Sequence, residues 1–247
     1  LFNSLKLQTV LVTPVTGSYS LTMGNQEYIL MPNQIIYISR AGDSIMVRDM
    51  ATNLGKWNRV SLIGQTGEDA IRVSPITPSS PARVYDNNLG FYVDFDCVMT
   101  INLVSMPNYI AGVVETESGT AAHIEFYKAQ ALLARTYALS HMERHSGEGF
   151  NLCDEVHCQA YKGKSMLNTD ILEAAKQTNG KVIVDTSMQL IIGTFHANCG
   201  GQTAASEEVW LKGYYYLSSV TDSYCRSMPG AQWDVRIPMD DWREFLR

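Results

Sequence analysis

The run Tyr127-Lys-Ala-Gln-Ala-Leu-Leu-Ala-Arg-Thr-Tyr137 is the most informative stretch of this 247-residue chain. Its residues are mostly apolar or small, which predicts a packed helix over about residues 123–144, with Thr120 as its cap. Lys128 and Arg135 interrupt the apolar pattern. They are separated by two helical turns and therefore lie on one face of the helix. Because an unpaired buried charge is costly, we expect both side chains to have partners.

A second run, Gly112-Val-Val-Glu-Thr-Glu117, places two carboxylates just ahead of this helix. Residues 107–114 predict a short helix that leads into a turn at Glu115 and Glu117. A carboxyl group beside a buried helix acquires a shifted pKa, and such a group can act as an acid. The alternative is that these glutamates are surface residues of a loop.

Residues 1–81 predict a β-rich region. Four short runs of β-branched or aromatic residues are separated by Gly, Asn and Asp turns, which is the spacing of antiparallel strands. These runs are residues 7–13, 27–31, 34–39 and 44–48. The segment Pro75-Ile-Thr-Pro-Ser-Ser-Pro81 predicts a break or an exposed crossing. Beyond it, residues 82–85 and 89–93 continue the strands.

Helical and extended patterns are mixed in the rest of the chain. A second helix is expected over residues 169–177, capped by Asn168 or Thr169 and ended by Asn179-Gly180. Further strands are expected over residues 181–185 and 190–196. The predicted class is therefore α+β, with a mainly antiparallel β-rich N-terminal region followed by a helix-containing part.

Composition narrows the range of functions. Charged residues make up 18% of the chain, the net charge is −6 and the pI is near 5.4. A nucleic-acid-binding protein would usually be basic, so no nucleic-acid partner is expected. The 13 tyrosines and 4 tryptophans suit a surface that binds sugars, although most of them are expected to be core or interface residues.

The apolar stretches, such as residues 110–114 and 182–184, are far shorter than the ~20 residues of a membrane-spanning helix. The chain starts at Leu1 without a methionine, so we expect that an export signal or anchor has been removed. Membrane contact is then expected only through that removed segment.

Cys153 and Cys158 flank His157, and His145 precedes them. Such a Cys2His2 set favours tetrahedral zinc, and four protein ligands leave no open position, so the metal would be structural. His141 competes with His145 for the fourth place. The alternative is a disulfide between the two cysteines.

The other three cysteines have separate expected roles. Cys199 and Cys225 can form a disulfide if the protein is exported. Cys97 follows an alternating run and is expected to be a buried strand thiol. It also remains open that all five cysteines are reduced.

The two runs quoted first, together with Cys153-Asp-Glu-Val-His-Cys-Gln-Ala-Tyr161 and Phe195-His-Ala-Asn-Cys-Gly-Gly-Gln-Thr-Ala-Ala-Ser-Glu-Glu-Val-Trp210, resemble the SpoIID/LytB family. The resemblance covers about residue 82 to the C-terminus. Residues 82–247 are therefore expected to form a SpoIID-like catalytic module that follows the β-rich region 1–81 in the chain. The resemblance implies an exported protein of the cell envelope, a lytic transglycosylase that acts on peptidoglycan glycan strands.

The resemblance also implies roles for residues. Glu117 falls on the family's glutamate, whereas Glu115 falls on a variable position. The family usually continues with Met-Pro, where this chain has Ser118-Gly119. A single glutamic acid can protonate the glycosidic oxygen and then accept the proton of the muramic C6 hydroxyl, so no cofactor is needed for catalysis. This reaction cleaves between N-acetylmuramic acid and N-acetylglucosamine and leaves a 1,6-anhydro end.

Eight further residues are expected to contact the substrate: Lys128, Arg135, Tyr137, Gln159, Tyr161, His196, Thr203 and Ser206. For Lys128 and Arg135, an internal ion pair or a bond from helix to loop is an equal alternative. His196 is equally expected to be a structural hydrogen-bonding residue.

Two other functions remain open. A LytB-type module would bind the wall and stimulate an amidase without catalysing a reaction, and it would tolerate Glu117→Gln. A metalloenzyme built on the Cys/His cluster would require an open zinc position, which four protein ligands do not leave. The resemblance further implies that glycan strands stripped of stem peptides are the favoured substrate.

Overall fold

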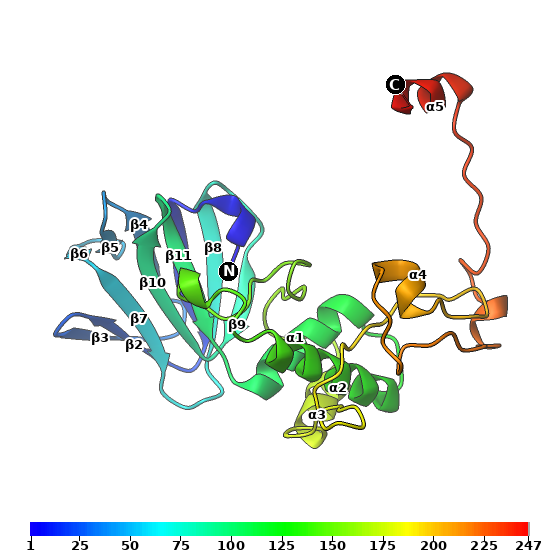
Figure 1. Ribbon diagram of the computed structural model, residues 1–247. Coiled ribbons are helices and arrows are strands. Elements are labelled where there is room, and N and C mark those ends of the chain that lie inside the picture. The colour runs from blue at the N-terminus through cyan, green and yellow to red at the C-terminus, as the bar shows by residue number, and fades with distance from the viewer. Residues whose placement is uncertain (247) are drawn as a thin grey trace. The chain divides into compact units, whose positions relative to one another are not determined.

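The computed structural model describes residues 1–246 and contains two compact units, Leu1–Gly193 and Thr194–Arg247. The first unit combines a β-sandwich with three helices (Figure 1). The second unit contains short helices and turns. Within the described residues, no helix is both long and apolar enough to span a bilayer.

The eleven strands of the described residues form two antiparallel sheets. The six-stranded sheet has the order β6-β5-β4-β1-β8-β9. Its strands are β1 (Thr9–Thr16), β4 (Ile36–Arg40), β5 (Ile45–Arg48), β6 (Asn53–Trp57), β8 (Ala70–Thr77) and β9 (Arg83–Asp86). The five-stranded sheet has the order β11-β10-β7-β2-β3. Its strands are β2 (Tyr19–Met23), β3 (Gln26–Leu30), β7 (Arg59–Gly64), β10 (Asn88–Asp94) and β11 (Cys97–Leu103).

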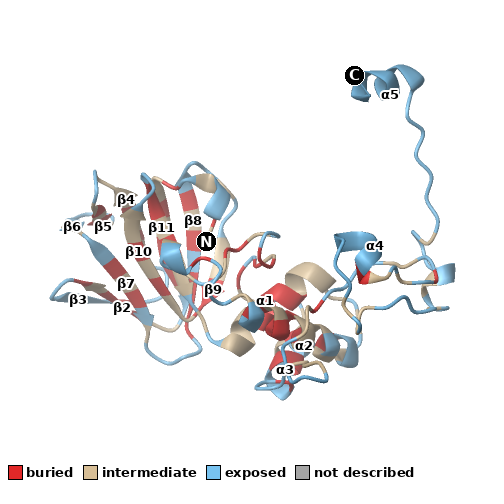
Figure 2. Cartoon of the chain, viewed as in Figure 1, coloured by how far each residue is buried: buried red, intermediate tan, exposed pale blue. Residues whose placement is uncertain are grey.

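The inward-facing side chains of both sheets make one apolar core. Val10 and Val12 of β1 and Leu21 and Leu62 of the other sheet are fully buried. Strand residues alternate between the two faces of a sheet, and β4, β5 and β7 accordingly bury every second side chain in this core. Figure 2 shows the buried residues along the strands and in the helices. The predicted α+β class, dominated by β-strands, is confirmed.

The strands continue past the boundary expected between residues 81 and 82. β9 pairs with β8, and β10 pairs with β7, so residues on both sides of that boundary share the same sheets. Pro75 was expected in a break, but it lies inside β8. It pairs with Val10 next to a register shift, where a missing backbone N–H is tolerated.

Three helices follow the sandwich in the first unit: α1 (Met106–Ser118), α2 (Ile124–Ser140) and α3 (Thr169–Gln177). The predicted bounds of α3 are confirmed, with Asn168 as its cap. The main helix is shorter than expected, because His123 rather than Thr120 caps α2 and the chain turns at His141. The strands expected over 181–185 and 190–196 are absent from the described residues, apart from an isolated bridge between Val184 and Leu190.

Candidate functional site

Glu117 lies in the last turn of α1, where a polar turn was expected. Its side chain is half-buried, and its Oε1 accepts a hydrogen bond of 3.1 Å from the Ala160 N–H. Burial raises the pKa of Glu117, and the hydrogen bond from Ala160 offsets part of that effect. The negative end of the helix dipole also disfavours a charge at this position. The site therefore holds a carboxyl group that is easier to protonate than an ordinary glutamate.

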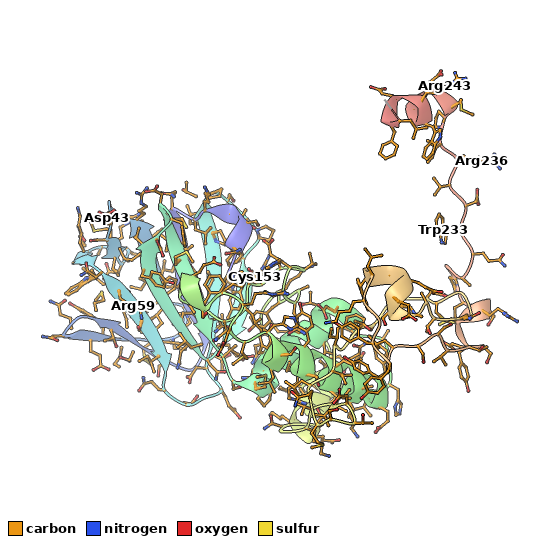
Figure 3. All side chains as sticks on the ribbon, in the orientation of Figure 1. Asp43, Arg59, Cys153, Trp233, Arg236 and Arg243 are labelled. Carbon is orange, nitrogen blue, oxygen red and sulfur yellow. The ribbon has the colours of Figure 1, made fainter. Side chains whose placement is uncertain are left out.

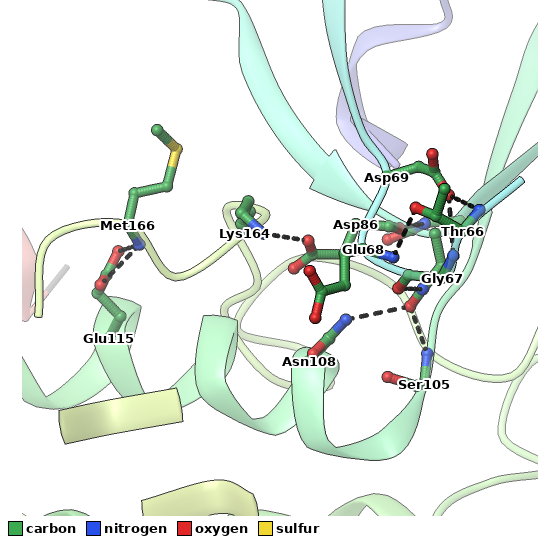
Figure 4. A network of polar contacts seen from close by, with 12 residues as sticks. Thr66, Gly67, Glu68, Asp69, Asp86, Ser105, Asn108, Glu115, Lys164 and Met166 are labelled. Carbon is green, nitrogen blue, oxygen red and sulfur yellow. Dashed lines mark hydrogen bonds and ion pairs between the residues drawn. The ribbon is translucent and has the colours of Figure 1, made fainter. Parts of the chain in front are cut away.

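Glu115 has a different environment, although it is only two residues away. Its carboxylate accepts hydrogen bonds from the Ser165 hydroxyl and from the backbone N–H groups of Met166 and Leu167. Figure 4 shows the contact with Met166. It therefore holds the segment 165–167 against α1. Glu115 accepts hydrogen bonds from three groups, whereas Glu117 accepts one from Ala160. Of the two carboxyl groups, Glu117 is therefore the one that can act as an acid.

Gly112 lets the chain pack tightly against α1. A Cβ atom at this position would lie 2.1 Å from the Gly163 carbonyl oxygen and 2.6 Å from the Tyr161 ring. Any side chain here would push away the segment that carries Ala160, the residue that donates to Glu117. The glycine of the Gly-Val-Val-Glu-Thr-Glu run is therefore required by this close approach.

Gln159 and Tyr161 lie on either side of Ala160, and both are buried. The Gln159 side chain donates to the Ala134 carbonyl of α2 and accepts from the Tyr109 hydroxyl of α1. The Tyr161 hydroxyl donates to Asn102. These contacts fix the position of the Ala160 N–H. Both side chains were expected to contact the substrate, but their burial gives them a supporting role in this structure.

Arg135 of α2 is also buried, with 1% of its surface exposed. Its guanidinium donates to the carbonyl oxygens of Ala175, Thr178 and Lys181, the first two at distances of 2.9 and 2.8 Å. It thereby satisfies one carbonyl in the last turn of α3 and two carbonyls just beyond the helix. This geometry fits the alternative of a helix-to-loop bond rather than a substrate contact.

Lys128 and Tyr137 lie nearer the surface of α2. Lys128 is half-buried and forms an ion pair of 2.7 Å with Glu125. Tyr137 is half-buried, its ring stacks on His141, and its hydroxyl accepts a hydrogen bond from Arg144. Both remain accessible enough to touch a bound ligand.

The structure brings together the four residues of the expected metal site. The ligand atoms of His145, Cys153, His157 and Cys158 all lie within 4.8 Å of one another. His157 Nδ1 is 3.7 Å from each sulfur atom. A turn closed by Cys158 N–H to the Glu155 carbonyl lets neighbouring ligands converge.

The environment of His145 fits a metal ligand. Its Nδ1 lies 2.6 Å from Glu148, while its buried Nε2 has no hydrogen-bond partner within residues 1–246. A metal-binding histidine typically donates one ring nitrogen to a carboxylate and coordinates through the other. His141 is instead bonded to the Tyr137 carbonyl, away from this set.

The cluster is tied to the sandwich by the residue after Cys153. Asp154 is buried and accepts hydrogen bonds from the backbone N–H groups of Phe2 and Asn3. It also forms an ion pair of 3.0 Å with Arg83. Figure 3 labels Cys153 on this loop.

A cavity of about 570 Å³ opens beside the cluster. It is lined by residues of β11, α1 and the loop 149–154, including Leu103, Tyr109 and Phe150. Glu117 is not among its lining residues, so this cavity is distinct from the position of the proposed acid.

The remaining candidates lie in the second unit, which is considered by itself. His196 is exposed. The Thr203 hydroxyl accepts from the Val220 N–H, and the buried Ser206 hydroxyl accepts from the Tyr214 N–H. Ser206 begins α4 (Ser206–Trp210), and α5 (Met239–Phe245) follows near the C-terminus. Two of the three candidates thus hold the local backbone in place.

Several contributors were not foreseen from the sequence. Tyr109, Glu148 and Asp154 support Glu117 or the Cys/His cluster from positions that carry no motif of their own. The spacing of Glu148, three residues after His145, is the one local signal available. The others depend on contacts between residues far apart in the chain.

Fold and site together define an α+β protein in which a half-buried glutamate of α1 meets a loop held by a Cys/His cluster. Residues 96–184 match the family model SpoIID, described as stage II sporulation protein. This segment contains Glu117, the whole of α2 and the Cys/His cluster. Over residues 96–184, the chain is therefore similar to the SpoIID family.

Curated relatives agree with this similarity. The chain is 30% identical to an uncharacterised protein of Brachyspira hyodysenteriae, over 58% of this chain and 39% of that protein. It is 32% identical to the amidase enhancer of Bacillus subtilis, over 46% of this chain and 15% of that protein. It is 28% identical to stage II sporulation protein D of Bacillus subtilis, over 53% of this chain and 42% of that protein. The aligned part thus spans well under half the length of these relatives.

Proposed function

We propose that this protein is an exported, cell-wall-active lytic transglycosylase that uses Glu117 as its single acid and base. The observation that carries the proposal is the half-buried carboxyl group of Glu117, which accepts a hydrogen bond from the Ala160 N–H and whose pKa is raised by burial. The match of residues 96–184 to the SpoIID family model and the similarity to stage II sporulation protein D support a role at the cell wall.

The chemistry follows from one carboxyl group. In its protonated form, Glu117 gives its proton to the oxygen between N-acetylmuramic acid and N-acetylglucosamine. The resulting carboxylate takes the proton of the muramic C6 hydroxyl, which attacks the anomeric carbon within the same sugar and leaves a 1,6-anhydro end. Because the nucleophile belongs to the substrate, much of the entropic cost of bringing it in is avoided.

Hydrolysis by the usual route would need a second carboxylate across the scissile bond. Glu115, the neighbouring carboxylate, is committed to Ser165 and to the backbone at 166–167. This commitment favours the one-carboxylate reaction. The expected substrate is glycan strands, especially those stripped of stem peptides.

Zinc has a structural role in this proposal. His145, Cys153, His157 and Cys158 would hold it, and four protein ligands leave no position for a reacting water. The metal would brace the segment that continues through Gln159 to Ala160, whose N–H donates to Glu117.

A second candidate function is supported by the similarity to a protein named amidase enhancer. In that case the protein would bind the wall and an amidase, and Glu117 would be a fold element of an inherited site. Partners would then include an N-acetylmuramoyl-L-alanine amidase.

The test is mass spectrometry of products from purified glycan strands, with and without stem peptides. We expect 1,6-anhydro-muramic ends from the parent protein and their loss, by at least ~100-fold, in Glu117→Gln. Glu143→Gln, a change at an exposed carboxylate, is the matched control and should keep full activity. Anhydro products from both variants would refute the role of Glu117. An inactive parent that still stimulates an amidase would favour the second candidate.

A further inference from the structure

We propose that Cys199, Asp222 and Cys225 form a second zinc-type metal site, separate from the Cys/His cluster. The two sulfur atoms and a carboxylate oxygen lie within 4.8 Å of one another. All three residues are half-buried and belong to the second unit. Two thiols and one carboxylate are a donor set that zinc accepts.

The spacing of the donors fits a shared metal. Cys199 Sγ lies 3.5 Å from Asp222 Oδ2. With Zn–S near 2.3 Å and Zn–O of about 2.0–2.2 Å in tetrahedral geometry, two ligands of one ion lie about 3.5–3.7 Å apart. The corresponding distance in the Cys/His cluster, between His157 Nδ1 and each sulfur, is 3.7 Å.

The carboxylate is oriented by the backbone. Asp222 Oδ1 accepts a hydrogen bond of 2.9 Å from the Tyr224 N–H, which leaves Oδ2 toward the thiol of Cys199. Support of this kind from outside the ligand set is typical of metal sites. The sequence suggested a disulfide between Cys199 and Cys225 instead. A disulfide would not explain why the Asp222 carboxylate is held next to the Cys199 thiol.

The two segments that carry the donors are already joined before any metal binds. The Asp222 N–H donates to the Gly201 carbonyl at 2.9 Å, and Thr203 N–H donates to the Val220 carbonyl at 2.9 Å. Gln202 and Thr221 form a β-bridge between them. A metal would therefore bind a preformed loop at little cost in chain entropy.

This part of the chain also needs a cross-link. Among residues 194–246, only Gly201 and Ser206 are buried, and large side chains such as Trp233 are exposed (Figure 3). A small unit with so little apolar core is usually stabilised by a metal or by disulfides. Three protein ligands would leave the fourth tetrahedral position to water or to an outside ligand.

The test is titration of the metal-free, reduced full chain with Co²⁺, followed by its thiolate-to-metal charge-transfer absorption. We expect two tetrahedral cobalt equivalents in the parent protein, and one fewer in Cys225→Ala. Cys158→Ala should remove the other equivalent, whereas Cys97→Ala, a change at a strand thiol outside both clusters, should remove neither.

Asp222→Asn separates the metal site from a disulfide, because it keeps both thiols. We expect it to weaken binding of the second equivalent at least ~10-fold. A parent that binds one equivalent, or an Asp222→Asn variant with unchanged affinity, would overturn the proposal. So would peptide mapping of the protein, isolated without reductant, that finds a disulfide between Cys199 and Cys225. None of these outcomes depends on transglycosylase activity.

Discussion

At the residue scale, the buried carboxyl group of Glu117 predicts how the stability of the protein depends on pH, which can be measured without a substrate. Because burial raises its pKa, its ionised form is disfavoured in the folded protein, and the stability that it contributes at low pH is lost as the pH rises through the raised pKa. Glu117→Gln removes the buried charge and keeps an acceptor for Ala160. We therefore expect this variant to be more stable at neutral pH, by up to about 1 kcal/mol.

Urea unfolding at several pH values measures this difference. The gain should shrink toward zero as the pH falls below the ordinary range of a glutamate, where both proteins are neutral at this position. In the active parent, kcat/KM should fall as the pH rises through the same raised pKa, because the acid form is consumed. A gain that stays constant with pH would contradict the assignment of a raised pKa.

Arg135 and Lys128 share one face of α2, but we expect them to contribute very different amounts to the free energy of unfolding. Arg135→Ala would leave the carbonyls of Ala175, Thr178 and Lys181 without their donor inside the protein. Each buried carbonyl left without a donor costs about 1–3 kcal/mol, so we expect a large drop in unfolding free energy. Lys128→Ala removes an exposed ion pair with Glu125 and should cost less than ~0.5 kcal/mol. Equal losses in urea unfolding would refute the distinction.

At the element scale, the Cys/His cluster and α1 meet through one short segment. Cys158 is followed by Gln159 and Ala160, and the Ala160 N–H reaches Glu117. If zinc holds the cluster, its removal should free this segment while the sandwich strands keep their own hydrogen bonds. We expect the Ala160 amide to exchange its hydrogen faster after chelation, together with amides of residues 153–161, with a lower Tm.

Hydrogen exchange followed by mass spectrometry measures this effect. Amides of β1 and β8, which pair with each other, are the internal reference and should be unchanged. A Cys158→Ala variant should exchange like the chelated parent and no longer respond to chelator. Uniform protection with and without metal would mean that the cluster does not brace the segment.

The elements also show what the sequence could predict. The bounds of α3 follow from Asn168 at one end and Gly180 at the other, because capping is local chemistry. α1 runs further than expected, through Glu115 and Glu117 to a Gly119 with φ of 69°, because the contacts of Glu115 with residues 165–167 hold its last turn. Those contacts join residues far apart in the chain, so no local sequence pattern could predict them.

The strands likewise fall into those that the local sequence predicted and those that it did not. Runs of β-branched residues predicted β1, β4 and β5. β6 contains Gly55 and polar residues, so its sequence did not predict a strand. Residues 181–185 have a good strand pattern but only one bridging partner, at Leu190. A strand needs a neighbour for its backbone groups, and the neighbour is a property of the whole fold. For the site, the spacing in the sequence predicted that two cysteines and two histidines would lie together, as they do. The burial of Arg135, Gln159 and Tyr161 could not be predicted in this way.

At the scale of the whole first unit, Asp154 couples the sandwich to the helical part. Its carboxylate accepts from the N–H groups of Phe2 and Asn3 and pairs with Arg83, while its neighbour Cys153 belongs to the cluster. Asp154→Ala would leave two buried or half-buried donors and a guanidinium without this partner. We expect a loss of about 3 kcal/mol or more in unfolding free energy.

The consequence for the whole unit is a loss of cooperativity. In the parent, sandwich and helices should unfold in one transition, since one buried cluster of apolar residues runs through both. In Asp154→Ala, the helical part with its cluster should unfold before the sandwich, so far-ultraviolet circular dichroism and tyrosine fluorescence should give different midpoints. Glu155→Gln, which alters the weaker 3.3 Å contact to the Ser4 N–H, is the matched control and should keep one transition. Coincident transitions in Asp154→Ala would show that the shared apolar core alone couples the two parts.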